Sequence, residues 1–121
     1  MNHFNKGLVL SKLDNLKAAN KSLTTAREKF GNDKSNLLYV YFCRYNLGIN
    51  YRKLQEYENS VIELKEAIVL YQDKPSVYNN LGLTYFEKNE IDQAIIEFTK
   101  AIKLEQSAVH YNNRGLAYIH E

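Results

Sequence analysis

Apolar side chains recur along this chain at steps of three and four residues, the spacing that places them on one face of an α-helix. The step is kept through 13–30, 57–71 and 91–104, and strand-like alternation is not sustained in any segment. Polar breaks separate the periodic segments. The pattern therefore predicts seven helices, over about residues 2–12, 14–30, 34–54, 56–71, 75–88, 91–104 and 107–120.

Residues that end or begin helices stand between these segments. The stretch GNDKS at 31–35 holds a helix-ending Gly and two residues that suit turns, and Pro75 can open a helix. The polar stretch EKNEIDQ at 87–93 separates two helices of one unit. With one Pro and five Gly in 121 residues, little of the chain is left for loops. We expect three helical hairpins and one unpaired helix in a single domain.

Four of the five glycines occur in one recurring phrase, which reads FNKGLVL at Gly7, YNLGINY at Gly48, YNNLGLTY at Gly82 and YNNRGLAY at Gly115. The spacings are 41, 34 and 33 residues. Recurrence of this kind indicates a structural repeat, in which each unit leaves an apolar face that the next unit covers. We expect each Gly to lie where the two helices of a hairpin cross closely. The seven extra residues before Gly48 are expected to lengthen the helix at 34–54.

These phrases resemble the tetratricopeptide repeat, a helix-turn-helix unit of 34 residues. The resemblance is most specific in Tyr78-x2-Leu81-Gly82-x2-Tyr85, followed by Ala94-x3-Phe98 and Ala101. Tyr78 stands in place of the usual Trp, and Gln106 in place of the usual late Pro.

The resemblance implies an all-α, right-handed superhelical solenoid of antiparallel helix hairpins in one domain. Its repeats are expected at about 1–33, 34–73 and 74–106, and the first helix of a fourth repeat at about 107–121. Because this last segment reads like an ordinary repeat opening, we expect the chain to be a fragment of a longer array.

Composition excludes several classes of partner. A net charge of +2 is too small to predict binding to nucleic acid or to an anionic membrane. The longest apolar run, LLYVYFC at 37–43, is far shorter than the roughly 20 residues of a membrane span. The lone Cys43 cannot form an internal disulfide, which fits a reducing compartment. A cytoplasmic location is expected.

Residues that could carry catalysis do not form a recognisable set. His3, His110 and His120 lack the spacing of metal ligands, and no Cys or carboxylate pair completes a site with them. Cys43 lies in an apolar helix and is expected to be a buried structural thiol. The repeat glycines lie inside predicted helices, so they do not form a phosphate-binding loop. The sequence predicts a protein that is not an enzyme and has no metal site or cofactor.

One polar position recurs two residues before every repeat Gly, and it is occupied by Asn5, Asn46, Asn80 and Asn113. The resemblance implies that this position faces the concave groove of the solenoid. A carboxamide offers a donor and an acceptor, as an extended peptide backbone does, so a row of four could hold a peptide. Two alternatives remain, because 14 of the 121 residues are Asn and because Asn can bond neighbouring helices instead.

Positions four and five residues after each Gly are expected to continue the groove wall. They include Lys12, Arg52 and Lys53 in the N-terminal half and Phe86 in the C-terminal half. A fitting ligand would be extended, with an acidic residue near Arg52 or Lys53 and an apolar one near Phe86. Acidic chaperone tails are not expected, because the lysines and arginine that hold them in similar grooves are absent here.

The predicted function is a non-catalytic protein-interaction scaffold that binds an extended peptide segment of a protein partner in its concave groove. One alternative is a regulatory or targeting module of a larger enzyme or of a peptide-sensing transcription regulator. Another is an architectural component of a cytoskeletal or ciliary assembly. Self-association is expected through Leu116, Tyr118 and Ile119 of the last helix, since an exposed apolar patch favours it.

Overall fold

The structure, a computed structural model, describes residues 3–30 and 34–121, and within these the side chains of residues 12–30 and 35–121. The described residues form α-helices and one short 3-10 helix, with no strand among them. The elements are α1 (His3–Phe30), η1 (Lys34–Asn36), α2 (Leu37–Lys53), α3 (Tyr57–Leu70), α4 (Pro75–Glu87), α5 (Ile91–Leu104) and α6 (Ala108–Ile119). The predicted all-α class is confirmed.

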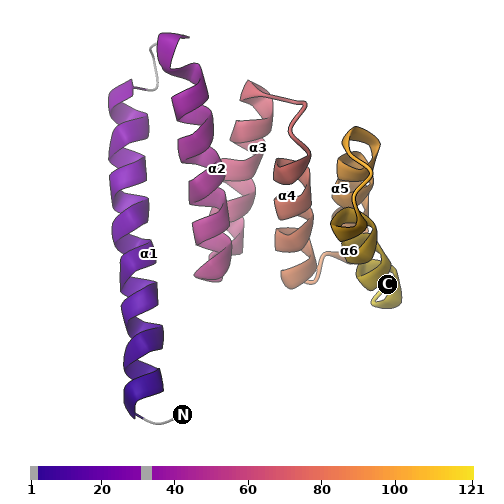
Figure 1. The fold of residues 1–121 in the computed structure, drawn as a ribbon, viewed down its shortest axis with the longest axis horizontal. Coiled ribbons are helices and arrows are strands. Elements are labelled where there is room, and N and C mark those ends of the chain that lie inside the picture. Colours follow the sequence, from indigo (N-terminus) through magenta and orange to yellow (C-terminus); the bar gives the residue numbers. More distant parts are fainter. Residues whose placement is uncertain (1–2, 31–33) are drawn as a thin grey trace.

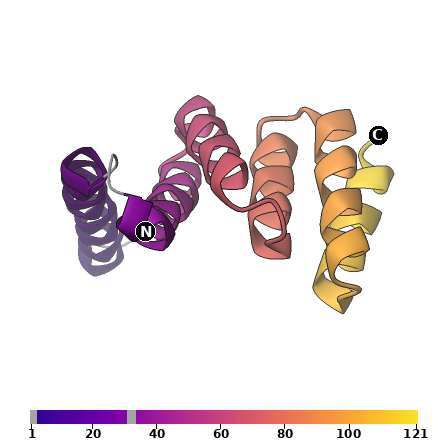
Figure 2. The same cartoon turned by 90° about the horizontal axis from the view of Figure 1, so that it is seen from above.

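The helices pack side by side in chain order, from α1 at one end to α5 and α6 at the other (Figures 1 and 2). Each helix contacts the next, and in addition α2 contacts α4 and α4 contacts α6. Helices α2, α4 and α6 therefore form one layer along the row. This stacking of helix pairs is a solenoid, as the repeated phrases predicted.

The first predicted hairpin is not formed. The helices expected at 2–12 and 14–30 are one continuous helix, α1, which reaches past the end of α2 (Figure 1). In the true hairpins the turn comes seven residues after the repeat Gly, through a residue with a left-handed backbone, at Gln55 (φ 63°) and Asn89 (φ 68°). Asp14 holds the same place in sequence after Gly7, but it lies inside α1. Neither Gly nor Pro stands near it to interrupt the helix.

Two of the four repeat glycines, Gly48 and Gly82, lie at close helix crossings as expected, whereas a Cβ atom added to Gly115 would meet nothing within 4 Å. A Cβ atom added to Gly48 would lie 2.5 Å from Cγ of Leu64, and one added to Gly82 would lie 2.5 Å from Cε1 of Phe98. Leu64 and Phe98 are 0% and 1% exposed, so neither can move away into solvent. The bulky residue of the second helix thus occupies the space that Gly leaves in the first.

The extra residues before Gly48 lengthen α2, also as expected. Gly48 is the twelfth residue of α2, whereas Gly82 is the eighth of α4 and Gly115 the eighth of α6. Four of the seven extra residues therefore form one added helical turn at the start of α2.

A buried ion-pair network holds α1 against the repeats. Glu63 of α3 is 7% exposed and pairs with Arg27 of α1 and with Arg44 of α2, the latter at 3.1 Å. Both arginines lie on helices other than that of the carboxylate. The network therefore connects three helices at one point.

Candidate peptide-binding face

The layer of α2, α4 and α6 carries the recurring Asn position. Asn46 is exposed, and Asn80 and Asn113 are half-buried. Asn5 lies in α1 outside the residues whose side chains the structure describes. Because α1 is not the first helix of a hairpin, the row has three described members. We name this layer of side chains the α2–α4–α6 face.

The amide nitrogens of two of these asparagines bond the neighbouring helix. Asn80 Nδ2 donates to the Tyr45 hydroxyl at 3.0 Å and to the Ser76 carbonyl at 2.9 Å. Asn113 Nδ2 donates to Asn79 Oδ1 at 2.9 Å. The alternative that Asn bonds neighbouring helices is therefore correct for the nitrogens. Among the described contacts, neither Asn80 Oδ1 nor Asn113 Oδ1 accepts a hydrogen bond, so both oxygens remain as acceptors.

Two further pairs cross between helices at the other end of the face. Arg52 Nη1 lies 3.1 Å from Glu87 Oε1, and the rings of Phe86 and His120 meet edge to face at 5.3 Å. Arg52 is thus already paired within the chain. Lys53 stays exposed on α2, and Lys12 stays exposed on α1. The basic half of the face is therefore weaker than the sequence suggested.

All four cross-helix contacts obey one rule. Positions are counted from the repeat Gly of each helix. A residue at one position contacts, in the next helix of the face, the residue whose position is larger by one. Tyr45 and Asn79 stand three residues before Gly and meet asparagines two before it. Arg52 and Phe86 stand four residues after Gly and meet residues five after it. The step from α2 to α4 is thus repeated from α4 to α6, which makes the face regular.

An apolar hollow of about 40 Å³ opens between α4, α5 and α6. It is lined by Leu83, Phe86, Phe98, Asn113 and Leu116. Phe86 is half-buried here, and Leu116 is 46% exposed. The predicted apolar position at Phe86 therefore lies beside Asn113, within one small recess.

Sequence reasoning missed two kinds of residue on this face. Tyr45 and Asn79, which hold the asparagines, share the position three residues before Gly, and the Gly register could have identified them. Phe42 and Val109 add exposed apolar surface, at 49% and 58% exposed. Each stands six residues before its Gly, so the same register predicts them as a pair.

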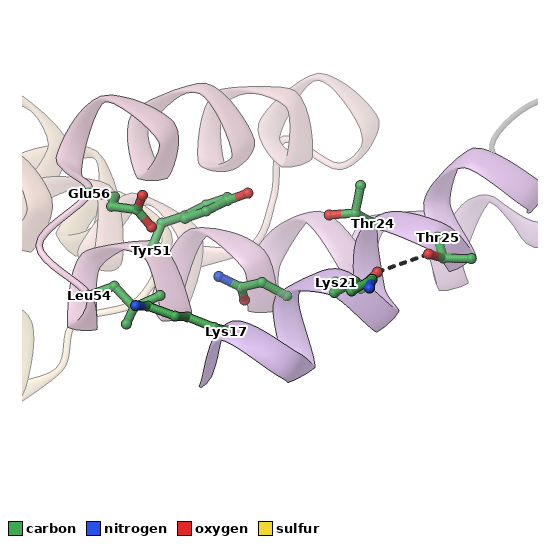
Figure 3. Close-up of a pocket in the computed structure, with 8 residues that line it drawn as sticks. Lys17, Lys21, Thr24, Thr25, Tyr51, Leu54 and Glu56 are labelled. Atoms are coloured by element: carbon green, nitrogen blue, oxygen red, sulfur yellow. Dashed lines mark hydrogen bonds between the residues drawn. The ribbon is translucent and has the colours of Figure 1, made fainter. Parts of the chain in front are cut away.

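A second hollow lies between α1 and the turn that joins α2 to α3 (Figure 3). Its volume is about 340 Å³, and it is lined by Lys17, Asn20, Lys21, Thr24, Thr25, Tyr51, Leu54 and Glu56. The Thr25 hydroxyl donates to the Lys21 carbonyl at 3.0 Å. Asn20 is 6% exposed, and its Oδ1 has no hydrogen-bond partner. These α1 side chains are not part of the α2–α4–α6 face.

The residues considered for catalysis do not come together in the described part of the chain. Cys43 is 2% exposed, and burial raises the pKa of its thiol despite the opposing effects of Tyr39 and Arg27. His110 is buried on α6, while His120 packs on Phe86. His3 lies outside the described side chains.

Residues 12–30 and 35–121 contain no group of three or more His, Cys, Asp or Glu side chains placed to hold a metal ion. Within the described residues, every helix is too short or too polar to cross a membrane.

Comparison with known families identifies the repeats. A family model described as TPR repeat matches residues 48–88, and one described as Tetratricopeptide repeat matches residues 75–107. A search of curated proteins gives no significant match. The two matched segments include α3, α4 and α5, with both of the tight helix crossings. Residues 48–107 therefore consist of tetratricopeptide repeats, which form modules for protein–protein interaction.

Proposed function

We propose that this chain is a non-catalytic scaffold that binds an extended segment of a partner protein on the α2–α4–α6 face. Its repeats are placed at about 34–73 and 74–106, and α6 opens the next one. The observation that carries the proposal is the pair of free carboxamide oxygens at Asn80 and Asn113. Their nitrogens are held by neighbouring helices, so each oxygen is fixed in orientation and can accept a hydrogen bond from an N–H donor.

An extended peptide backbone supplies such donors. In an extended chain, alternate residues point the same way and their N–H groups recur at about 6.6–6.8 Å. The exposed Asn46 can turn to donate or to accept, because no described contact holds it. Binding through backbone groups would be tolerant of sequence, and the side-chain positions beside the row would supply the selectivity.

Two positions beside the row define the ligand side chains. Lys53 is exposed and unpaired among the described contacts, so it is the cation that would meet an acidic ligand residue. Arg52 contributes less, because Glu87 already neutralises it. The recess at Phe86 and Leu116 would accept an apolar residue. We therefore propose a ligand with an acidic residue on the α2 side and an apolar residue on the α6 side.

The test begins with peptides selected from a displayed random library on the wild-type chain. Their affinity is then measured against a variant with Ala at Asn46, Asn80 and Asn113, and against a control with Ala at the exposed Asn59 of α3. We expect the triple variant to lose about 2–4 kcal/mol of binding free energy and the control to lose none. Equal affinity for both variants, with native circular dichroism, would favour an architectural role for the chain instead.

The alternative roles differ in which surface of the chain would bind a partner. A regulatory or targeting module of a larger enzyme, or of a transcription regulator, would use the same face on a segment of a signalling partner. A cytoskeletal or ciliary component would use the ends and the outer helices, and the face would stay free. A cytoplasmic setting fits all of these roles, because the only Cys is a buried free thiol.

A further inference from the structure

The hollow between α1 and the turn from α2 to α3 is lined by a polar residue where the other repeats have an apolar one. Helices α1, α3 and α5 share a small residue that is followed four residues later by Leu or Phe: Ala19, Ser60 and Ala94. The residue after it is Val61 in α3 and Ile95 in α5, and both pack against the hydrophobic core. In α1 it is Asn20, which is 6% exposed and lies in the covered stripe of the helix with Leu16 and Leu23. A buried carboxamide thus replaces an aliphatic side chain.

No group in the described part of the chain satisfies this carboxamide. Asn20 Oδ1 is buried without a hydrogen-bond partner, and Nδ2 donates to no described atom. A buried acceptor without a donor is unfavourable, and most buried polar groups in proteins are paired. Because Asn20 lines the hollow, a partial turn about its Cβ–Cγ bond brings the carboxamide towards a ligand there without breaking a hydrogen bond. The hollow therefore has a polar group that a ligand can satisfy.

Beside this Asn, α1 leaves space that is filled in the next repeat. Tyr51 and Tyr85 both stand three residues after their repeat Gly. Tyr85 is 7% exposed, whereas Tyr51 is only half-buried and lines the hollow. The volume of about 340 Å³ lies near the lower end of the range of small-molecule sites, which is roughly 300–1,000 Å³. The space therefore suits a small molecule.

Two lysines give the α1 side of the hollow a positive charge. Lys17 and Lys21 stand four residues apart and therefore on one face of α1. Both are exposed, and neither belongs to an ion pair among the described contacts. The half-buried Thr24 adds a hydroxyl to the same side. Ammonium and hydroxyl groups donate hydrogen bonds, so this side suits a carboxylate.

The opposite side of the hollow carries one free carboxylate. Glu56, on the turn from α2 to α3, is exposed and has no partner among the described contacts. In the next hairpin Glu90 stands at the same place and pairs with Lys88 at 3.0 Å. The place of that lysine is taken here by Leu54, which leaves the Glu56 carboxylate available to an ammonium group.

We propose that this hollow, which is separate from the α2–α4–α6 face, binds a small acidic amino acid. Such a molecule has two carboxylates and one ammonium group, which complement the two ammonium groups and the one carboxylate that line the hollow. Figure 3 shows Lys17 on the side of Glu56 and Lys21 on the side of the two threonines. The α-carboxylate then meets Lys17, the α-ammonium meets Glu56, and the side-chain carboxylate meets Lys21. The oxygen of Asn20 accepts a second hydrogen bond from the ammonium group.

Titration with L-glutamate and with L-aspartate, followed by backbone amide resonances in NMR, tests the proposal. At least one of the two should give saturable shifts at the hollow. The matching dicarboxylate, glutarate or succinate, should bind about tenfold more weakly, because a charge-assisted hydrogen bond is lost. Glu56→Gln should remove that difference. Lys21→Gln should in the same way remove the preference over L-glutamine or L-asparagine, whereas Lys65→Gln, exposed on α3, should change neither comparison.

Asn20→Val separates binding from folding. It gives α1 the residue that α3 has at this place, so the chain should stay folded while the affinity for the amino acid falls about tenfold. Three results would overturn the proposal: no saturable shift with either amino acid, equal affinity for the dicarboxylate, or unchanged affinity in Asn20→Val. If Asn20→Val loses helix by circular dichroism, the comparisons at Glu56 and Lys21 decide, since both side chains are exposed.

Discussion

The hairpin crossing at Gly82 makes the sharpest prediction about the fold. In Gly82→Ala, the new Cβ would lie 2.5 Å from Cε1 and 2.6 Å from Cδ1 of Phe98. Ordinary contacts between carbon atoms are about 3.5–4.0 Å, so the helices must separate or the ring must leave its rotamer. Because Phe98 is 1% exposed, the ring has no free space to enter.

The expected cost follows from two opposing effects. Overpacking of a filled core costs about 1–3 kcal/mol, while Ala is favoured over Gly inside a helix by about 0.8–1.0 kcal/mol. Gly82→Ala should therefore destabilise the chain by up to about 2 kcal/mol. Gly115→Ala is the matched control, because it adds the same methyl group to the same position of a helix with nothing within 4 Å. It should stabilise by about 0.8–1.0 kcal/mol.

Thermal unfolding followed by circular dichroism measures both variants. A change of 1 kcal/mol should move the midpoint by about 4 °C in a chain of this size. Gly82→Ala should unfold at a lower temperature than the wild type and Gly115→Ala at a higher one. Midpoints that shift equally and in the same direction would show that Gly82 is not at a close crossing. A low chain concentration keeps self-association from adding to the difference.

Three other properties of the fold can be tested by unfolding. Glu63→Gln should lower the free energy of unfolding, measured by urea denaturation, by about 1–2 kcal/mol, because two partly exposed arginines lose their charge partner. Glu97→Gln should cost much less, because its Oε2 has no hydrogen-bond partner and its cation is exposed. Gln55→Gly should stabilise by about 1 kcal/mol, since Gln55 has a left-handed backbone with φ 63°. Burial, with smaller effects of nearby charges, raises the pKa of Tyr41 to about 12, so the folded state keeps a proton that the unfolded chain loses near its ordinary pKa of about 10. Stability should be level below about pH 10 and fall towards pH 12, and Tyr41→Phe should reduce that fall in alkaline urea titrations.

The repeats were predictable from sequence because their signal is local. The phrase around Gly82 and the pattern through Phe98 lie within one hairpin, and their spacing sets the crossing. The same use of local repeat positions led to the wrong prediction of a hairpin in the segment that forms α1. Asp14 occupies the turn position of a repeat, but a turn also needs a residue that leaves the helix, and the segment around Asp14 continues as helix instead.

The face was only partly predictable, because its contacts join different repeats. The sequence located Asn80 and Asn113 in one column but did not give their partners. Those partners depend on how far one repeat is offset from the next, which the packing of α3 on α4 and α5 on α6 determines. The same offset pairs Arg52 with Glu87, which removed a charge that the sequence had assigned to the ligand.

The central claim, that a peptide lies on the α2–α4–α6 face, is tested most directly by methyl resonances in NMR. Two sets of aliphatic residues report on opposite sides of the molecule. Leu83, Val109 and Leu116 lie on the face or its recess, and the exposed Ile62, Val69 and Ile96 lie on α3 and α5.

Titration with a library-selected peptide should shift the methyl resonances of the first set and leave those of the second set unchanged. The shifts should reach saturation with the dissociation constant measured for binding. Shifts confined to Ile62, Val69 and Ile96 would contradict the claim, because the ligand would then lie on the outer helices.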